Sequence, residues 1–345
     1  MNSSASIVKT ILADRHPHPR IEKGVAFAPA NIALCKYWGK RDTVLNLPVT
    51  NSLSLSMGQY GATTEIACIN QPLDQISLNG VLLLDNNLPF VKRIRSFLDC
   101  LRMTDNRHAQ STPITTDTRF SVKTQMNLPV GAGLASSSCG FAALVKALDV
   151  LFGWQLPLKA LSILARLGSG SACRSLWTGF VEWEKGERSD GMDSYGVALP
   201  EEWPGLKMGL WILDPNPKPL SSREAMLRTV GTSPFYSAWS SLVEGDLKAL
   251  KSAIALKDFE QLGATLEANA CSLHGLMMSA RPPILYSTDR TLKAIHQIRE
   301  ARKQGLSIYF TQDAGPNLKL FFLDSSQAKI EEYFPDIHII SPWEV

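Results

Sequence analysis

Pro129-Val-Gly-Ala-Gly-Leu-Ala-Ser-Ser-Ser-Cys-Gly140 is the most informative stretch of this sequence, because it leads directly into an apolar segment with helical periodicity. Its glycines leave the backbone free to approach a ligand, and its three serines stand where the helix is expected to begin. The free amides and the dipole at a helix N-terminus favour an anion. The stretch is therefore predicted to form a phosphate cradle for a nucleotide or a phosphorylated metabolite.

The segment behind the cradle is predicted to be a buried helix. Its apolar residues recur at three- and four-residue spacing and form one stripe: Phe141, Leu144, Val145, Leu148, Leu151 and Phe152. A serine can cap its start, and Gly153 suits a left-handed end. The alternative interpretation is an ordinary Gly/Ser turn before a core helix. No Gly-Lys-Ser/Thr follows, so the cradle is not a P-loop, and its spacing is not that of a dinucleotide fingerprint.

Composition narrows the class of protein. A chain of 345 residues can form one large domain or two lobes, and 45% hydrophobic with 19% charged residues is typical of a globular protein. The net charge of +3 is not concentrated, so nothing indicates a nucleic-acid partner. The six cysteines have no paired spacing, which indicates a reducing compartment. No apolar run reaches the ~18 residues of a membrane span. We expect a cytoplasmic protein with no membrane partner.

The order of the expected elements predicts an α+β fold, since strands come first, helices lie between and strands return at the end. Residues 1–24 are polar, lack the features of a signal peptide and are expected to be a loosely packed extension. The polar connection from Glu184 to Ser194 is the expected boundary between an N-terminal lobe (25–195) and a C-terminal lobe (196–345). The expected elements are strands over 25–84, a helix over 89–103, a polar loop over 105–116, a strand over 120–126, the cradle helix, a helix over 157–167, strands over 179–183 and 208–213, helices up to Lys303, and strands over 307–310 and 319–323.

Two further segments carry cations suited to an anionic ligand. Ala28-Pro-Ala-Asn-Ile-Ala-Leu-Cys-Lys-Tyr-Trp-Gly-Lys-Arg-Asp42 places Lys36, Lys40 and Arg41 among aromatic residues, although a surface hairpin with ordinary lysines would read the same way. Gly168-Ser-Gly-Ser-Ala-Cys-Arg-Ser175 combines small residues with Arg174, whose planar guanidinium suits a carboxylate or a phosphate. By contrast, Lys92, Arg93 and Arg95 are interpreted as the solvated face of a helix.

A fourth segment, Thr311-Gln-Asp-Ala-Gly-Pro-Asn317, lies between two apolar, strand-like runs. Its acid, Asp313, can be an ordinary turn former or a general base held by a rigid strand end. Asp193, in Asp190-Gly-Met-Asp-Ser194, is the competing candidate for the base and can equally be a turn acid.

Together these segments and the cradle resemble the GHMP kinase superfamily and, within it, the mevalonate diphosphate decarboxylases. The motifs Asn-Ile-Ala-x-x-Lys-Tyr-Trp-Gly-Lys-Arg-Asp, Gly-Leu-Ala-Ser-Ser, Gly-Ser-Gly-Ser-Ala-Cys-Arg-Ser and Asp-Ala-Gly-Pro-Asn occur in the family's order. The resemblance covers about residues 25 to 325. It implies a two-lobed GHMP kinase-like α+β fold with a central cleft, whose N-terminal lobe is like domain 2 of ribosomal protein S5.

The resemblance also implies an activity. The family converts (R)-5-diphosphomevalonate and ATP into isopentenyl diphosphate, ADP, phosphate and carbon dioxide, in the mevalonate pathway of isoprenoid biosynthesis. Asp313 would orient or deprotonate the tertiary hydroxyl, Lys36 would stabilise the transferring phosphoryl group, and Arg174 would hold the C1 carboxylate. Mg²⁺ would be held mainly by phosphate oxygens and water, with no metal-ligating side chain assigned. A homodimer is expected from the family.

The remaining site residues are also implied by the resemblance. Those expected at the substrate are Asn31, Tyr37, Lys40, Ser169, Ser171, Ser222 and Met226. Those expected at the ATP phosphates are Gly133, Leu134, Ala135, Ser136, Ser137 and Ser138. Two positions depart from the family pattern. Arg223 stands where relatives often carry threonine in Ser-Ser-Thr-x-Gly-Met, and Gln312 replaces an apolar residue before the acid.

Other activities compete with this interpretation. A sister enzyme could decarboxylate the 5-monophosphate or stop after phosphorylation as a mevalonate 3-kinase, and a sensor could bind both ligands without catalysis. A kinase that stops at phosphorylation is expected to lack the set of Lys36, Arg174 and Asp313, which favours full decarboxylation. A sensor is expected to lose the acid or the cradle, and this chain keeps both.

Overall fold

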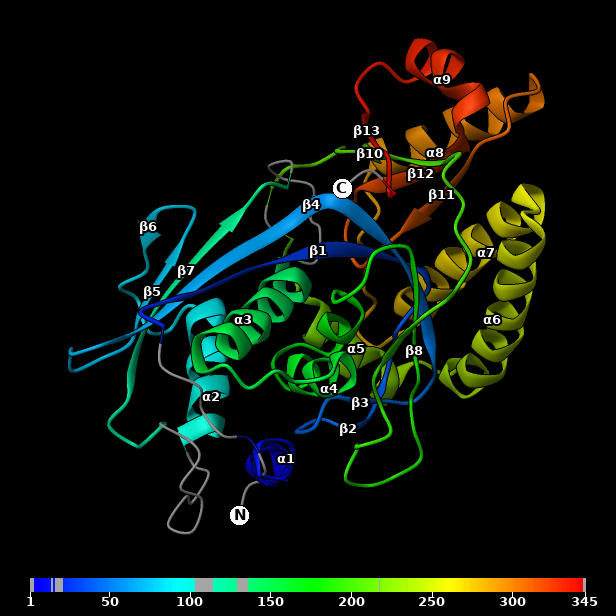
Figure 1. Ribbon diagram of the computed structural model, residues 1–345. Coiled ribbons are helices and arrows are strands. Elements are labelled where there is room, and N and C mark those ends of the chain that lie inside the picture. Colours follow the sequence, from blue (N-terminus) through cyan, green and yellow to red (C-terminus); the bar gives the residue numbers. More distant parts are fainter. Residues whose placement is uncertain are drawn as a thin grey trace.

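The computed structural model describes residues 3–13, 15, 21–102, 114–128, 136–216 and 218–343. Within this part of the chain, seven strands form one mixed sheet and four form a second sheet (Figure 1). The order of the first sheet is β6-β5-β7-β4-β8-β9, with β1 paired to β4. Its strands are β1 (Gly24–Cys35), β4 (Ser52–Ile69), β5 (Gln75–Leu78), β6 (Val81–Leu82), β7 (Arg119–Met126), β8 (Phe180–Trp183) and β9 (Gly196–Ala198).

Three helices lie together on one face of the first sheet: α2 (Pro89–Arg102), α3 (Ser136–Phe152) and α4 (Leu158–Gly168) (Figure 1). The helix α3 packs on β1 and β4, and its expected apolar stripe is buried at every position. It ends before Gly153, whose φ of 61° is the left-handed conformation expected there. The local sequence therefore sets the end of this helix.

The second sheet has the order β11-β12-β10-β13 and carries the later helices. Its strands are β10 (Leu206–Trp211), β11 (Tyr309–Gln312), β12 (Leu318–Leu323) and β13 (His338–Ile340). The helices of this half are α5 (Ser222–Thr232), α6 (Trp239–Leu256), α7 (Phe259–Met278), α8 (Asp289–Lys303) and the short α9 (Gln327–Tyr333). Because α7 contacts β1 as well as β11 and β12, it joins the two sheets.

Residues near the N-terminus differ from expectation. Ser3–Leu12 form a helix, α1, which contacts α2 and α4. Its residues Ala5, Val8 and Leu12 fall on one face of the helix and are at most 4% exposed. The prediction of a loosely packed extension is therefore wrong for this segment, because a short apolar stripe inside a polar stretch finds a surface to cover.

The passage between the two halves also lies later than expected. β9 pairs with β8 in the first sheet, with Gly196 opposite Trp183. The polar connection over 184–194 is thus a loop between two strands of one sheet, and it is not a boundary between lobes. The chain crosses to the second sheet between Ala198 and Leu206.

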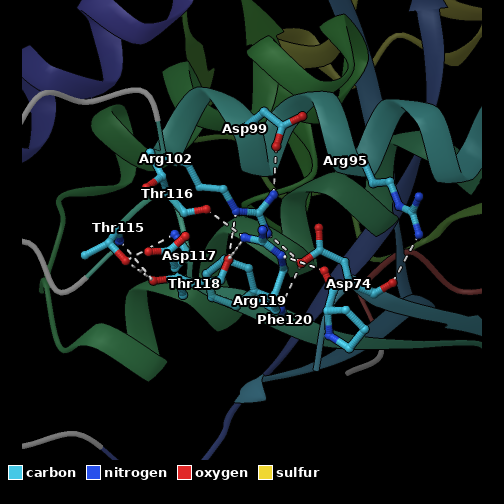
Figure 2. Close-up of polar contacts among 11 residues, drawn as sticks. Asp74, Arg95, Asp99, Arg102, Thr115, Thr116, Asp117, Thr118, Arg119 and Phe120 are labelled. Atoms are coloured by element: carbon cyan, nitrogen blue, oxygen red, sulfur yellow. Dashed lines mark hydrogen bonds and ion pairs between the residues drawn. The ribbon is translucent and has the colours of Figure 1, made fainter. Parts of the chain in front are cut away.

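A buried ion pair fixes the C-terminal end of α2 (Figure 2). Arg102 donates to Oδ1 of Asp74 at 2.5 Å and to the carbonyl of Thr118 at 2.9 Å. The same Asp74 oxygen accepts the backbone N–H of Phe120 at 2.9 Å. The Arg102 and Asp74 side chains are only 9% and 5% exposed. The helix end is therefore tied to the start of β7 and to the residue before β5.

Candidate active site

Lys36 stands directly after β1, where a helix from the other half of the fold reaches it. Its ammonium group donates to Oδ1 of Asp313 at 2.7 Å and to the carbonyl of Ala33 at 2.8 Å. Its backbone N–H donates to Oδ1 of Asn269 at 2.8 Å. Asn269 lies on α7, is fully buried and in turn donates to Asp246 on α6 at 2.8 Å. The second half of the fold thus binds both the backbone N–H and the ammonium group of Lys36.

Asp313 follows β11 and begins a tight turn. The N–H of Gly315 donates to the carbonyl of Asp313 at 2.7 Å. The side chain of Gln312 donates to the carbonyl of Gly315 at 2.9 Å and exchanges a hydrogen bond with Ser287. The departure from the family pattern at Gln312 therefore fastens the turn, and the Gln312 side chain does not face the Asp313 carboxylate. The Asp313 side chain remains 33% exposed.

A second lysine, Lys319 on β12, binds the other oxygen of the Asp313 carboxylate. Its Nζ lies 3.0 Å from Oδ2, and its side chain is only 3% exposed. Burial opposes ionisation of Asp313, but the ammonium groups of Lys319 and Lys36 outweigh it and hold the pKa of Asp313 well below its usual range. Burial lowers the pKa of Lys36, and the Asp313 carboxylate opposes this effect. The acid of the site is accordingly an anion at neutral pH.

His274 on α7 lies behind the same turn. Its Nε2 is 3.2 Å from the carbonyl oxygen of Asp313. Burial lowers the pKa of His274 to about 4, so the ring is neutral at physiological pH. Because a carbonyl oxygen can only accept a hydrogen bond, Nε2 carries the proton and donates it to this oxygen. The ring supports the backbone of the turn without adding charge to the site.

Arg174 lies in the 3₁₀ turn η1 (Gly170–Arg174) and is 2% exposed. Its guanidinium donates to the hydroxyl of Ser52 at 2.5 Å and to the side-chain oxygen of Asn31 at 3.3 Å. Its Nε is buried and has no hydrogen-bond partner in the part of the chain that the structure describes. No carboxylate of the described residues forms an ion pair with it. A buried guanidinium that hydrogen-bonds to neutral groups and keeps a spare donor is suited to an anionic ligand.

The small residues around η1 pack against Tyr37. The rings of Tyr37 and Trp183 are 4.7 Å apart, and a Cβ at Gly170 would lie 3.1 Å from the Tyr37 hydroxyl. That hydroxyl is buried and has no hydrogen-bond partner among the described residues, and burial raises the pKa of Tyr37. The carbonyl of Ser171 accepts a hydrogen bond from Asn31 at 3.3 Å. These predicted substrate residues therefore lie around Arg174.

A second group of cations gathers around Lys40, which begins the small hairpin of β2 (Lys40–Asp42) and β3 (Leu47–Pro48). Lys40 donates to Asn46 at 2.6 Å. Burial, together with the charges of Arg223 on α5 and Arg93 on α2, lowers the pKa of Lys40 to about 8. Within the described residues, none of the three cations forms an ion pair with a carboxylate. We call Lys40, Arg93 and Arg223 the cationic cluster.

The structure gives three arginines surroundings that their sequence context did not indicate. Arg223, a departure from the family pattern, adds positive charge beside Lys40. Arg93 is exposed, as expected for a solvated helix face, and its charge also acts on Lys40. Arg41, expected to join Lys36 and Lys40, instead donates to the carbonyls of residues 185, 186 and 188 in the loop between β8 and β9. Its sequence neighbours gave no sign of that distant loop.

The ATP side of the predicted site begins at α3. Gly133, Leu134 and Ala135 lie outside the described residues, and Ser136 is the first residue of the helix. The hydroxyl of Ser137 lies 3.2 Å from that of Ser169, and Ser138 is fully buried. The first turn of α3 has no acidic residue to repel an anion. The contact between Ser137 and Ser169 joins the N-terminus of α3 to the turn that carries Arg174.

The structure adds Lys218 to the site. Its ammonium group donates to the hydroxyl of Ser222 at 2.6 Å and to the carbonyl of Ala314 at 2.8 Å. It thereby joins the start of α5, where the predicted substrate residue Met226 is also buried, to the Asp313 turn. No motif singled out Lys218, whereas Lys319 could have been noticed as the only charge in the apolar run of β12.

Asp193, the alternative base, lies elsewhere. Its carboxylate accepts the backbone N–H groups of Glu187 and Arg188 at 2.8 and 3.0 Å. Among the described residues it makes no contact with Lys36 or Arg174. Asp193 is therefore a turn acid of the loop between β8 and β9.

The fold and the site together define an enzyme of the GHMP kinase type, in which residues of two α/β halves meet at one acid. Two family models cover most of the chain. The diphosphomevalonate decarboxylase-like N-terminal domain matches residues 28–196, and the mevalonate 5-diphosphate decarboxylase C-terminal domain matches residues 210–341. The chain belongs to the diphosphomevalonate decarboxylase family.

Curated relatives and solved structures agree with these matches. The diphosphomevalonate decarboxylase of Candida albicans is 37% identical over 312 residues, which cover 88% of this chain and 85% of the relative. That of Saccharomyces cerevisiae is 34% identical and covers 88% of this chain and 78% of the relative. The mevalonate diphosphate decarboxylase of Staphylococcus aureus superimposes with a TM-score of 0.84 at 33% identity, covering 94% of this chain and 96% of that one. A structure of the Enterococcus faecalis enzyme gives 0.82 at 36% identity, covering 92% and 95%.

Proposed function

We propose that Asp313, Lys36 and Arg174 carry out the ATP-dependent decarboxylation of (R)-5-diphosphomevalonate to isopentenyl diphosphate. The ion pair between Lys36 and Asp313 is the observation that carries this proposal, because it joins residues 277 positions apart at a partly exposed carboxylate. The family membership of the chain supports the same reaction. Products other than the alkene are ADP, phosphate and carbon dioxide.

The first chemical step needs an anion beside the tertiary hydroxyl of the substrate. Asp313 is held ionised by two ammonium groups and is accessible, so it accepts a hydrogen bond from that hydroxyl and orients its oxygen for attack on the phosphoryl group. Lys36 donates to Asp313 and lies where negative charge develops during the transfer. This step turns the hydroxyl into a phosphate leaving group.

The second step breaks the bond between C1 and C2 of the substrate. Its electron pair forms the double bond between C2 and C3 while phosphate leaves from C3 and the carboxylate departs as carbon dioxide. Arg174 holds the carboxylate through its free donors until then, and its fixed contacts with Ser52 and Asn31 orient the guanidinium. Keeping the carboxylate aligned allows the C1–C2 bond to break as phosphate leaves.

The diphosphate group requires cations outside this pair. The cationic cluster supplies three positive charges, and Lys218 supplies a fourth near Ser222. The buried hydroxyl of Tyr37, which has no hydrogen-bond partner within the described ranges, can serve as a further donor. Ser169, Ser171 and Met226 line the neighbouring turn and helix start. A site of this charge favours the 5-diphosphate over the 5-monophosphate.

The N-terminus of α3 fits ATP, because its first turn offers serine hydroxyls and no acid. Ser137 and Ser138 would hold the phosphates together with the predicted residues 133–136. Within the described residues, no three His, Cys, Asp or Glu side chains gather in a group that could hold a metal ion. Bound ATP supplies the phosphoryl group, and Mg²⁺ neutralises charge on the ATP phosphates. A solved structure that is 37% identical to this chain, with a TM-score of 0.83, is of a complex with MVAPP, AMPPCP and magnesium.

The activity is tested by incubating the protein with Mg-ATP and either the 5-diphosphate or the 5-monophosphate of mevalonate. We expect ADP and carbon dioxide in equal amounts from the 5-diphosphate and much slower turnover of the 5-monophosphate. Release of ADP without carbon dioxide would identify a kinase and contradict the proposal. A preference for the 5-monophosphate would assign the sister activity.

A further inference from the structure

The proposed mechanism leaves one buried charge of the site without a role. Lys319 lies on β12, a strand paired on both sides, opposite Thr311 of β11 and Leu210 of β10. Its backbone is therefore fixed by two ladders. Its side chain is 3% exposed, and its Nζ lies 3.0 Å from Oδ2 of Asp313. A lysine placed so rigidly against the reacting acid is suited to set that acid's orientation.

The position is costly unless the charge is paired. The Lys319 side chain is buried, and so is Phe321, the next residue of the strand on the same face. An ammonium group in such surroundings is strongly disfavoured without a carboxylate. Among the described residues, Asp313 is the only acid that forms an ion pair with Lys319. This leaves two cases. In the first, Lys319 serves to hold Asp313; in the second, Asp313 serves only to neutralise the charge of Lys319.

The surroundings of Asp313 separate these two cases. The groups that face it are Lys36 after β1, Lys319 on β12, Lys218 before α5, Arg174 in η1 and the neutral His274 on α7. Four of the five are cations, so neutralising one lysine does not explain the arrangement. Lys36 and Lys319 also bind different oxygens of the carboxylate, Lys36 at Oδ1 and Lys319 at Oδ2. These two contacts fix the plane of the carboxylate.

We propose that Lys319 is a positioning residue for the reaction: it holds Oδ2 of Asp313, so that Lys36 binds only Oδ1 and the ionised carboxylate stays turned toward the tertiary hydroxyl of the substrate. Lys319 acts through Asp313 and does not itself contact the reacting atoms. This inference rests on the proposed function, because it assigns how the acid of that reaction is held.

Removal of Lys319 has two consequences. The carboxylate becomes free to rotate about its Cβ–Cγ bond, and misplacement of a reacting group by about 1 Å costs on the order of 10²-fold in rate. The charge beside Lys36 also disappears. Burial is the main cause of the lowered pKa of Lys36, Asp313 opposes it, and Lys319 and Arg174 lower it further. Without Lys319, Lys36 therefore keeps its proton to a higher pH.

The test compares Lys319→Met, which keeps the length of the side chain without its charge, with Lys319→Arg, which keeps the charge. Single-turnover release of carbon dioxide is followed across pH at saturating Mg-ATP and 5-diphosphomevalonate. We expect Lys319→Met to slow release by roughly 10- to 100-fold, with the affinities for both ligands within about threefold of wild type. We expect the loss of activity at alkaline pH to move to higher pH in Lys319→Met only, and Lys319→Arg to recover much of the rate.

Each result decides between the two cases. An unchanged rate in Lys319→Met overturns the inference. Equal losses in both variants without movement of the alkaline limb also overturn it, since they indicate packing alone. Circular dichroism and ATP affinity show whether each variant folds, and Lys319→Gln, which also removes the charge, takes over the pH test if Lys319→Met does not fold. Absence of carbon dioxide from the wild-type protein is a separate result, which contradicts the proposed function itself.

Discussion

Two glycines of one helix offer a direct test of how the Asp313 turn is held in place. Gly263 and Gly275 both lie within α7. A Cβ added to Gly275 meets no atom of the described residues within 4 Å, whereas one added to Gly263 would lie 1.9 Å from Cδ2 and 2.2 Å from Cγ of Tyr309. Tyr309 is the first residue of β11, the strand that leads to Asp313. The same substitution at the two sites therefore separates helix propensity from packing.

We expect Gly275→Ala to stabilise the protein by about 0.5–1 kcal/mol, because alanine loses less conformational entropy in a helix. Gly263→Ala gains the same amount but forces the base of the Tyr309 ring to move. That ring has little room, since it packs against Phe259 at 5.6 Å and beneath Arg302 at 4.3 Å. Overpacking of a core costs typically about 1–3 kcal/mol. Because the contact involves the base of the ring, we take the upper value of about 3 kcal/mol. After the helix gain is subtracted, Gly263→Ala is expected to lower the free energy of unfolding by about 2 kcal/mol.

The assay has two readouts. Urea unfolding gives the change in stability, and the rate of carbon dioxide release reports the position of the Asp313 turn. We expect Gly263→Ala to be less stable and slower than wild type, and Gly275→Ala to be more stable with its rate unchanged. Equal stability of the two variants would refute the reasoning, because it would mean that β11 can move away from α7 at no cost.

Three further predictions follow from the site and its frame. Asp313→Asn should abolish release of carbon dioxide with ATP affinity retained, while Asp193→Asn stays active; an inactive Asp193→Asn with an active Asp313→Asn would reverse the assignment of the base. Lys40 binds an anion only as a cation, so kcat/KM should fall as pH rises through about 8; in Lys40→Arg this fall should be absent, and its persistence would exclude Lys40 as the titrating group. Arg102→Met leaves Asp74 buried and unpaired and should cost about 3–5 kcal/mol in urea unfolding, against less than about 0.5 kcal/mol for Lys248→Met in an exposed i,i+4 pair.

Local sequence was a good guide wherever a structure depends on neighbours in the chain. Asn79-Gly80 is a dipeptide typical of a tight hairpin turn, and both residues have positive φ. The bounds of α2 and β7 agree with expectation to within a residue or two. Where a short segment could be satisfied only by a distant surface, prediction failed. The helix α1 and the docking of Arg41 on the loop between β8 and β9 are the two examples.

The sequence by itself determined the family and the α3 helix with its serine-rich start, and it singled out Lys36, Arg174 and Asp313 as the candidate site residues. These are properties of short segments, in which periodicity, capping residues and motif order can be read directly. Only the tertiary structure decided that Lys319 shares Asp313 with Lys36, that Arg223 and Arg93 gather at Lys40, and that Asp193 is a turn acid. Charge and pKa depend on burial and on partners within a few ångströms, and here packing brings those partners together from strands and helices far apart in the chain.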